Sequence, residues 1–448
     1  MSANCHSDAH GPDRGGVQTR LGHLPEELLL RIVDFAYGPD VDLDHAYILA
    51  DRHGVFHALA LVDRRLNRLA TPLLYKVFAT SENPFRERQR IRKTELFLRA
   101  LKENALLRAH VRGLCLYTAE GRDKYPSLDV FDRVKELVTL VPNTHFLHMN
   151  GGFDDFRSQT LDIVSTAIVN MRHLRHLSLN RQGYGPTLQD VAEAFRRSWG
   201  VKRLSLNGVT AMTGVTSPII HEKEYRTASF THLTLKDYSE DWAATEQLLS
   251  WPKELHSFQF GNFRNNPNDM DLAMFGSALL QHRNTLTVLD LGFLRRRNTD
   301  SQMIDLSQFS ALRELTLSRW SFNNTNLTFS YETGRKLLAP KLRTFTWSFG
   351  IGFMESERLS DVGPNEEAWL RDFGTYAADR HDGSLRTMYV RYLPIRVLGE
   401  QGSAEYPWDR LRRVADELAA RDIELLYSDP KWSRDEWEKC VKAWEEWT

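Results

Sequence analysis

The side chains that could ligate a metal or attack a substrate are scattered along this sequence. Cys5, His6 and His10 lie in a polar N-terminal stretch that holds no cluster of further ligands, and His381 with Asp382 forms an isolated pair in an expected turn. No segment matches the phosphate-binding, dinucleotide-binding, zinc-protease or serine-hydrolase patterns. The sequence therefore predicts no catalytic constellation, no metal site and no cofactor.

The composition is that of a globular chain without excess charge. Of its 448 residues 42% are hydrophobic and 26% are charged, and the net charge is −1. This balance argues against a nucleic-acid-binding or membrane-surface protein as a whole. No stretch approaches the about 18 apolar residues of a membrane helix. Cys5, Cys115 and Cys440 are too far apart for a disulfide framework, so an intracellular location, cytoplasmic or nuclear, is expected.

The chain is organised around copies of one phrase, L-x-x-L-x-L. The phrase is clear at Leu174, Leu177 and Leu179, and its last four residues alternate as a half-buried strand does. Because such a strand cannot bury its apolar face alone, stacked copies must bury one another, which predicts a solenoid over residues 111–428. The fourth positions of the clearest copies are 25 to 31 residues apart, at residues 177, 204, 233, 258, 289, 315 and 345.

Residues 21–80 are expected to form a separate helical module, preceded by a disordered polar tail over residues 1–20. Pro25 suits the first turn of a helix with one apolar face, and a second apolar run extends from Val55 to Leu74. The apolar surface of these short helices exceeds what they can bury among themselves. Part of it is therefore expected to face a partner.

This module resembles the F-box. Residues 24–32 read L-P-E-E-L-L-L-R-I, similar to the opening of that family, and residues 59–75 are similar to its second half. The resemblance implies three helices that dock on a Skp-type adaptor of a cullin–RING ubiquitin ligase, while the following segment recruits the target. It assigns adaptor contacts, or supporting core positions in the second half, to Leu24, Pro25, Leu28, Leu29, Ile32, Leu61, Val62, Leu66, Leu74 and Tyr75.

The connection between the two halves departs from the family pattern. Residues 38–55 carry several aspartates and are more numerous than most F-boxes have there. Loop closure entropy grows only with the logarithm of length, so the fold can absorb them. Adaptor docking would weaken if the loop overhung the interface. A helical cap for the solenoid, with no adaptor, is the alternative interpretation.

Residues 81–110 are expected to form a basic linking helix. Nine Arg or Lys side chains between residues 84 and 112 allow a nucleic-acid interpretation. Interleaved acids and apolar residues at helical spacing favour a solvated helix face instead. The passage over residues 104–114 also resembles the bridge into leucine-rich repeats of many fungal F-box proteins.

The repeats resemble leucine-rich repeats, which implies an α/β fold with parallel strands on a concave side and helices or loops outside. Outer helices are expected with apolar faces at Leu188, Leu272 and Trp369, the last capped by Asn365. Where that family usually places asparagine this chain has mostly apolar residues, such as Val209. The side-chain ladder of the family is therefore expected to be missing.

The residues that flank the second and third apolar positions should face the concave side. A protein target is expected to bind there, although a solvated strand face without a partner is the alternative. The glycine-bearing loop around Phe353 is interpreted as either tucked core or a binding loop. The expected target-binding residues are Arg203, Thr234, Gln259, Asp290, Tyr389 and Phe353.

Residues 429–448 carry four tryptophans and are expected to form a helix that caps the solenoid, with a partner-binding helix as the alternative. The resemblances together indicate the substrate-recognition subunit of an SCF-type (Skp–cullin–F-box) ubiquitin ligase, which makes no bond itself. A repeat scaffold with no ubiquitin role is the second interpretation. A hydrolase with an unrecognised site is the third and has the least support.

Overall fold

We describe the protein from a computed structural model. The chain divides into two compact units, Met1–Phe78 and Ala79–Thr448, and each is described by itself. The structure describes residues 24–37, 53–80, 87–118, 128–153, 156–181, 185–196, 200–211, 218–261, 270–294, 303–322, 327–350, 361–380, 384–394, 405–430 and 432–445.

The described part of the first unit holds three helices, α1 (Glu26–Tyr37), α3 (His53–Val62) and α4 (Arg64–Leu74). The short strand β1 (Val77–Ala79) follows them and crosses the boundary between the units. Helix α3 passes into α4 across Asp63, whose carboxylate accepts a hydrogen bond from the Leu66 amide at 2.7 Å. This is the usual way to satisfy a donor at a helix start, so α4 begins sharply after the turn.

The second unit is a parallel solenoid, as predicted. The described strands form one sheet in chain order from β1 to β12, and every neighbouring pair from β2 onwards is parallel. Leu204 is aligned with Leu177 and Leu233, and all three are at most 1% exposed. The strands are β1 (Val77–Ala79), β2 (Gly113–Tyr117), β3 (Phe146–Asn150), β4 (His176–Asn180), β5 (Arg203–Asn207), β6 (His232–Lys236), β7 (Ser257–Gly261), β8 (Val288–Leu291), β9 (Glu314–Ser318), β10 (Thr344–Ser348), β11 (Thr387–Arg391) and β12 (Glu424–Tyr427).

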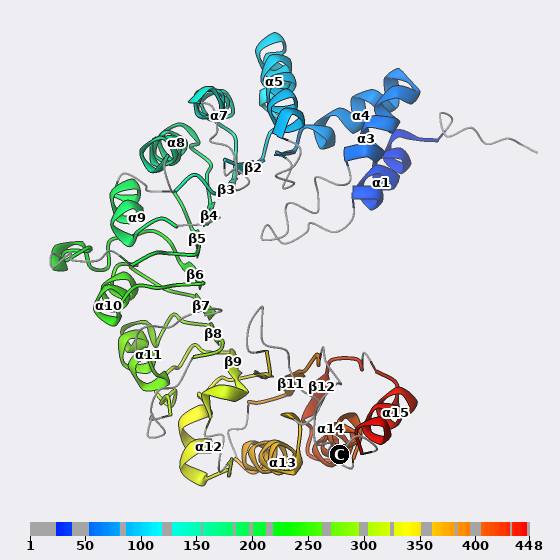
Figure 1. The fold of residues 1–448 in the computed structure, drawn as a ribbon, viewed down its shortest axis with the longest axis vertical. Coiled ribbons are helices and arrows are strands. Elements are labelled where there is room, and N and C mark those ends of the chain that lie inside the picture. Colours follow the sequence, from blue (N-terminus) through cyan, green and yellow to red (C-terminus); the bar gives the residue numbers. More distant parts are fainter. Residues whose placement is uncertain are drawn as a thin grey trace, which may run out of the picture. The chain divides into compact units, whose positions relative to one another are not determined.

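Helices cover the outer side of this sheet within the second unit (Figure 1). The predicted faces at Leu188 and Leu272 are confirmed, since both side chains are buried. The predicted cap at Asn365 is wrong: Pro364 starts its helix and Gly363 is the capping residue. The described α-helices of the second unit are α5 (Glu87–Glu103), α6 (Ala105–Arg108), α7 (Leu128–Leu140), α8 (Arg157–Asn170), α9 (Leu188–Phe195), α10 (Trp242–Ser250), α11 (Leu272–Leu279), α12 (Tyr331–Leu337), α13 (Pro364–Ala378), α14 (Pro407–Ala419) and α15 (Arg434–Glu445).

The connections on the outer side are irregular, as the uneven repeat spacing indicates. Short 3₁₀ turns occur at Glu222–Glu224, Leu280–His282 and Arg319–Ser321. The described part of the connection from β8 to β9 contains no helix. Its outer layer is supplied by three fully buried side chains, Ile304, Leu306 and Phe309. Burial of apolar surface, and not a fixed helix, is therefore what each repeat requires.

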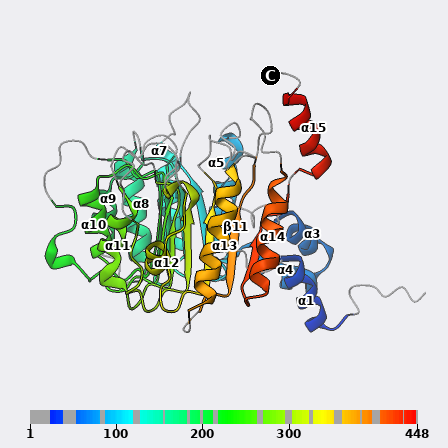
Figure 2. The same ribbon diagram turned by 90° about the horizontal axis from the view of Figure 1, so that it is seen from below.

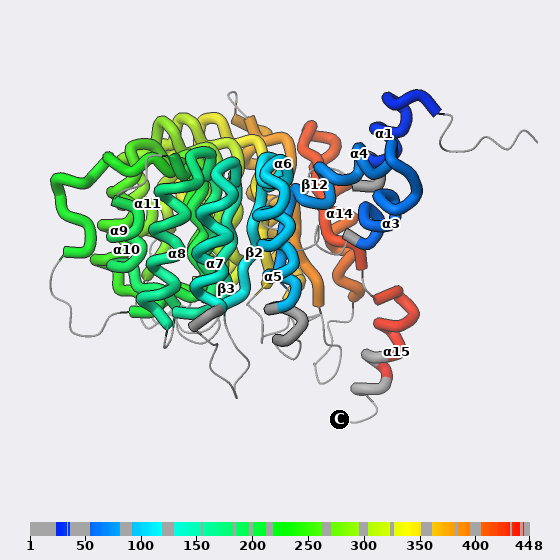
Figure 3. Tube along the Cα trace, turned by 90° about the horizontal axis from the view of Figure 1, so that it is seen from above, coloured from blue at the N-terminus to red at the C-terminus, as the bar shows by residue number. Residues whose placement is uncertain are grey.

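Helix α5 corrects the expectation of a separate linker. It packs beside α7 as the first member of the outer row (Figure 3). Its Leu101 is fully buried, and Lys102 forms an ion pair with Glu136 of α7 at 2.6 Å. Glu95 likewise pairs with Arg133 of α7 at 2.7 Å. Several charges of this basic segment therefore serve helix packing inside the second unit.

Side chains other than asparagine satisfy the turns before the strands. Arg175 donates to the carbonyl of Gly200 at 2.9 Å, in the next repeat along the chain. Lys202 donates in the same way to Ser229. Further along, hydroxyl groups do this work; Ser384, for example, donates to the carbonyl of Leu342. At the other ends of the strands, the expected apolar residues occupy the asparagine position, since Val209, Tyr238 and Leu294 are buried.

Helix α14 packs on the last strand, β12, and α15 packs on the N-terminal end of α14. Trp408 of α14 is buried and donates from its indole nitrogen to the carbonyl of Ser428 at 2.9 Å. Trp437 of α15 packs on Tyr406, with ring centroids 5.7 Å apart. Only the Trp437 side chain of the predicted helix face is described; Cys440, Val441 and Trp444 lie outside the described side chains.

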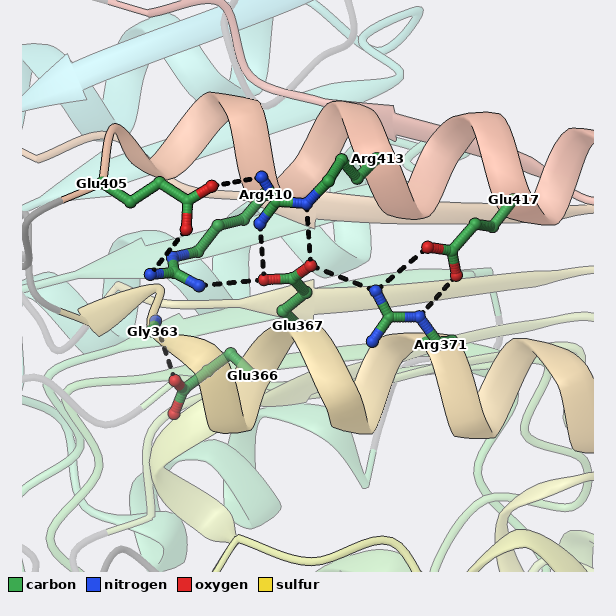
Figure 4. A network of polar contacts seen from close by, with 8 residues as sticks. All are labelled: Gly363, Glu366, Glu367, Arg371, Glu405, Arg410, Arg413 and Glu417. Carbon is green, nitrogen blue, oxygen red and sulfur yellow. Dashed lines mark hydrogen bonds and ion pairs between the residues drawn. The ribbon is translucent and has the colours of Figure 1, made fainter.

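A network of charges joins α13 to α14, which run side by side (Figure 2). Glu367 of α13 accepts hydrogen bonds from Arg410 at 2.9 Å, Arg413 at 2.9 Å and Arg371 at 3.1 Å (Figure 4). Glu417 of α14 forms an ion pair with Arg371 of α13. Burial by itself would raise the pKa of the Glu367 carboxyl, but the three arginines outweigh it and lower the pKa.

The lowered pKa predicts an acid-sensitive junction between α13 and α14. A carboxyl whose pKa is lowered by folding stabilises the native state above its unfolded pKa of about 4.3, and this contribution is lost as the pH falls through the native pKa. Glu367→Gln should cost about 1.5–3 kcal/mol at neutral pH, because hydrogen bonds to charged groups are lost. It should also flatten the decline of stability below about pH 4.5. Urea unfolding between neutral and acid pH measures both effects.

The matched control is Glu417→Gln, since Glu417 is 45% exposed and, among the described residues, pairs only with Arg371 at the outer end of the network. Its effect should stay below about 1 kcal/mol, as for other exposed ion pairs. Equal losses in the two variants, or an unchanged acid limb in Glu367→Gln, would contradict the importance of the buried carboxylate.

Candidate functional site

The first unit exposes a set of large apolar side chains. Leu61 is 72% exposed and Val62 is 64% exposed at the end of α3, where an isolated module would gain by burying them. The set extends beyond the predicted residues to Leu30, Phe35 and Val55, which belong to the same two helices. Its members on α1 and α3 are Leu28, Leu30, Ile32, Phe35, Val55, Leu61 and Val62.

The small core of this unit divides the expected adaptor-contact residues into buried and exposed ones. Leu29 is fully buried and packs with Leu66 and Leu69, and Leu24 is packed against the same cluster. The side chains of Leu29 and Leu66 are therefore not available to a partner, because they hold α1 on α4. Leu24 has a partly structural role. Of the remaining expected residues Pro25 is exposed, and Leu74 and Tyr75 are half-buried.

The concave residues of the second unit form the row that the sequence predicts. Adjacent strands align Ser178, Ser205, Thr234, Gln259 and Asp290. The row continues through Thr316 and Thr346 to Tyr389. Arg203 is exposed one row away, at the start of β5. Phe353 lies outside the described residues.

Hydrogen bonds link parts of this row across strands. His148 contacts Ser178 at 3.1 Å through Nδ1 and Asn180 at 3.3 Å through Nε2. Thr234 donates to the side-chain oxygen of Gln259 at 3.3 Å. The concave face therefore offers hydroxyl, amide and imidazole groups at fixed positions, which suits recognition by hydrogen bonds.

Asp290 is the acidic member of the row. Burial raises the pKa of its carboxyl, and the charges of Arg391 and Lys236 offset part of that rise. His232 is a basic group beside the row. Burial lowers the pKa of its imidazole, and the charges of Arg203 and His256 lower it further. His232 is therefore neutral at physiological pH and acts as a hydrogen-bonding group.

Catalytic and metal chemistry has little support in the part of the chain that the structure describes. There, no three His, Cys, Asp or Glu side chains converge as ligands of a metal. Cys115 is buried in β2. His381 and Asp382 lie outside the described residues. No described helix has the length and apolar character needed to cross a bilayer.

Comparisons with known proteins find a weak structural similarity and no family. No family model matches this chain, and a search of curated proteins finds no match. Among solved structures it is similar to the crystal structure of the Rad7 and Elc1 complex in yeast, with a TM-score of 0.26 and 11% sequence identity. The match covers 79% of this chain and 94% of that one. A TM-score this low supports no inference about function.

The division of the first unit into surface and core predicts opposite effects of substitution. Leu61→Ser with Val62→Ser should leave the unit folded, because exposed positions change stability by about 0.5 kcal/mol or less. Leu66→Ala should cost about 2–5 kcal/mol by opening a cavity. Hydrogen exchange of the α3 and α4 amides in the full chain measures both. Equal loss of protection in the two variants would place Leu61 and Val62 in the core.

Proposed function

We propose that this protein is the substrate-recognition subunit of an SCF-type ubiquitin ligase. In this proposal the first unit binds a Skp-type adaptor and, through it, a cullin–RING ligase, while the second unit holds a protein target. The observation that carries the proposal is the exposed apolar set on α1 and α3. It coincides with Leu28, Ile32, Leu61 and Val62, to which the F-box resemblance assigns adaptor contacts.

Exposure of these side chains is costly without a partner. Burying a large aliphatic side chain stabilises by about 1.5–3 kcal/mol, so covering several of them can supply the core of a protein interface. The unit is small, and its described core holds α1 on α4 without using the exposed set. The short junction at Asp63 fixes the start of α4, so the exposed residues at the end of α3 sit on a defined support.

The mechanism requires no bond-making by this chain. A target held on the second unit and a ubiquitin-loaded enzyme held through the adaptor meet at high effective concentration. The first unit then determines which ligase is recruited, and the second unit determines what is modified. A repeat scaffold with no ubiquitin role shares the second property and lacks the first, so adaptor binding separates the two functions.

Leu61→Glu with Val62→Glu should abolish adaptor binding while the chain stays folded. Introducing carboxylates at the centre of an apolar interface buries charge without a partner, and hot-spot residues are worth about 2 kcal/mol or more each. We expect at least about a thirtyfold loss of affinity. Co-expression and titration calorimetry with a Skp-type adaptor measure it.

The matched control is Leu106→Glu with Val169→Glu, two apolar positions on α6 and α8 that are 76% and 63% exposed. This control should bind adaptor as the wild type does. If the folded wild type fails to retain the adaptor at micromolar concentration, the ubiquitin function is wrong and the scaffold function replaces it.

The concave row should carry the target. Thr234→Arg places a long cation on the row, and should abolish capture of the proteins that the wild type retains when the proteasome is blocked. Ser277→Arg adds the same charge on the exposed side of α11 and should leave capture unchanged. Quantitative mass spectrometry of the captured proteins, with adaptor as an internal standard, gives the comparison. An unchanged set with Thr234→Arg would move target binding away from this row.

A further inference from the structure

Three arginines occupy equivalent positions at the turns before consecutive strands of the second unit. Arg313 precedes β9, Arg343 precedes β10 and Arg386 precedes β11. The amide of Arg343 donates to the carbonyl of Arg313 at 2.8 Å, and the amide of Arg386 donates to that of Arg343 at 2.9 Å. Their backbones are thus in register, with neighbours about 4.8 Å apart as in any sheet. We name Arg313, Arg343 and Arg386 the arginine ladder.

Among the described residues, the ladder side chains make no contact that would stabilise the fold. Earlier cations at the same position, Arg175 and Lys202, donate to carbonyl groups of the following turn. At the turn that precedes β11, Ser384 donates to carbonyl groups of the turn before β10 instead. All three ladder side chains are exposed and form no hydrogen bond or ion pair within the described chain.

The described residues beside the ladder are polar and include no aromatic platform. Each arginine is followed directly by the first residue of its strand: Glu314, Thr344 and Thr387. Glu314 is exposed and forms no ion pair with the ladder among the described residues. Single-stranded nucleic acids are bound by cations interleaved with aromatic rings, which this edge of the sheet does not offer.

We infer that the arginine ladder binds an acidic segment of a protein partner. Each guanidinium presents a planar fork of donors that matches a carboxylate in two parallel hydrogen bonds. Acidic side chains three or four residues apart on a helix lie about 5–6 Å apart, close to the ladder spacing. An acidic helix or turn that runs across the strands therefore meets successive arginines with successive carboxylates, and the adjacent threonine hydroxyls add donors.

This inference deepens the proposed function, because it gives the chemical class of a target, and it rests on that function only for the identity of the bound protein. The ladder belongs to the second unit and the expected adaptor contacts belong to the first. Loss of one activity therefore leaves the other measurable.

The test uses the full chain and a fluorescein-labelled poly-glutamate peptide, with binding followed by anisotropy. Arg343→Glu with Arg386→Glu should weaken binding at least about tenfold at low salt, and the difference should shrink as salt screens the charges. Arg343→Lys with Arg386→Lys keeps the charge and loses the fork, so an intermediate loss is expected.

The matched control is Lys223→Glu with Lys439→Glu, two exposed cations outside the ladder, which changes the net charge by the same amount. It should bind the peptide as the wild type does. Equal weakening in the control and the ladder variant, or no weakening in either, would overturn the inference. So would binding of single-stranded nucleic acid, through the same arginines, that is tighter than peptide binding. Adaptor binding is measured in every variant as well. If it is retained while the peptide test fails, the inference about the ladder is wrong and the proposed function still stands.

Discussion

The structure depends on the in-register stacking of apolar residues along a parallel sheet. One strand of the L-x-x-L-x-L type presents too little apolar surface for a core, so each repeat is stable only between neighbours. Leu177, Leu204 and Leu233 illustrate this, since each is aligned with the next and is shielded from water. Because register is shared, every other side chain of the phrase is repeated at a fixed spacing as well.

That shared register determines which groups are available for binding. Alternation places polar residues such as Thr234 and Gln259 on the concave face, in contact across strands. The same register aligns Arg313, Arg343 and Arg386 at one edge of the sheet. The stacking that stabilises the second unit therefore also aligns single polar residues in extended rows. A segment of another protein can bind along such a row.

A repeat at the end of the array has a stacking neighbour on one side only, so other contacts must stabilise it. At the C-terminal end, Trp408 donates to the carbonyl of Ser428 beside the last strand, and Trp437 packs on Tyr406. Glu367 accepts hydrogen bonds from three arginines at the contact between α13 and α14. The first unit is stabilised differently. A few buried leucines hold its helices together, while Leu61 and Val62 remain exposed to solvent. An exposed apolar set on a small supported module suits docking more than it suits stability.

Much of this was determined by the sequence alone, because it depends on local period. Alternation around Leu177 predicts the strand and its buried face, the repeat spacing predicts the solenoid, and the concave row follows with its register. The apolar excess of the first unit is visible in the same way.

Tertiary structure alone decided which apolar residues became core, as Leu29 did, and that Pro364 and not Asn365 starts α13. It alone decided that α5 joins the outer row and that Glu367 meets Arg413. These contacts join residues tens of positions apart, and their pairing is set by how whole repeats pack, which no local pattern encodes.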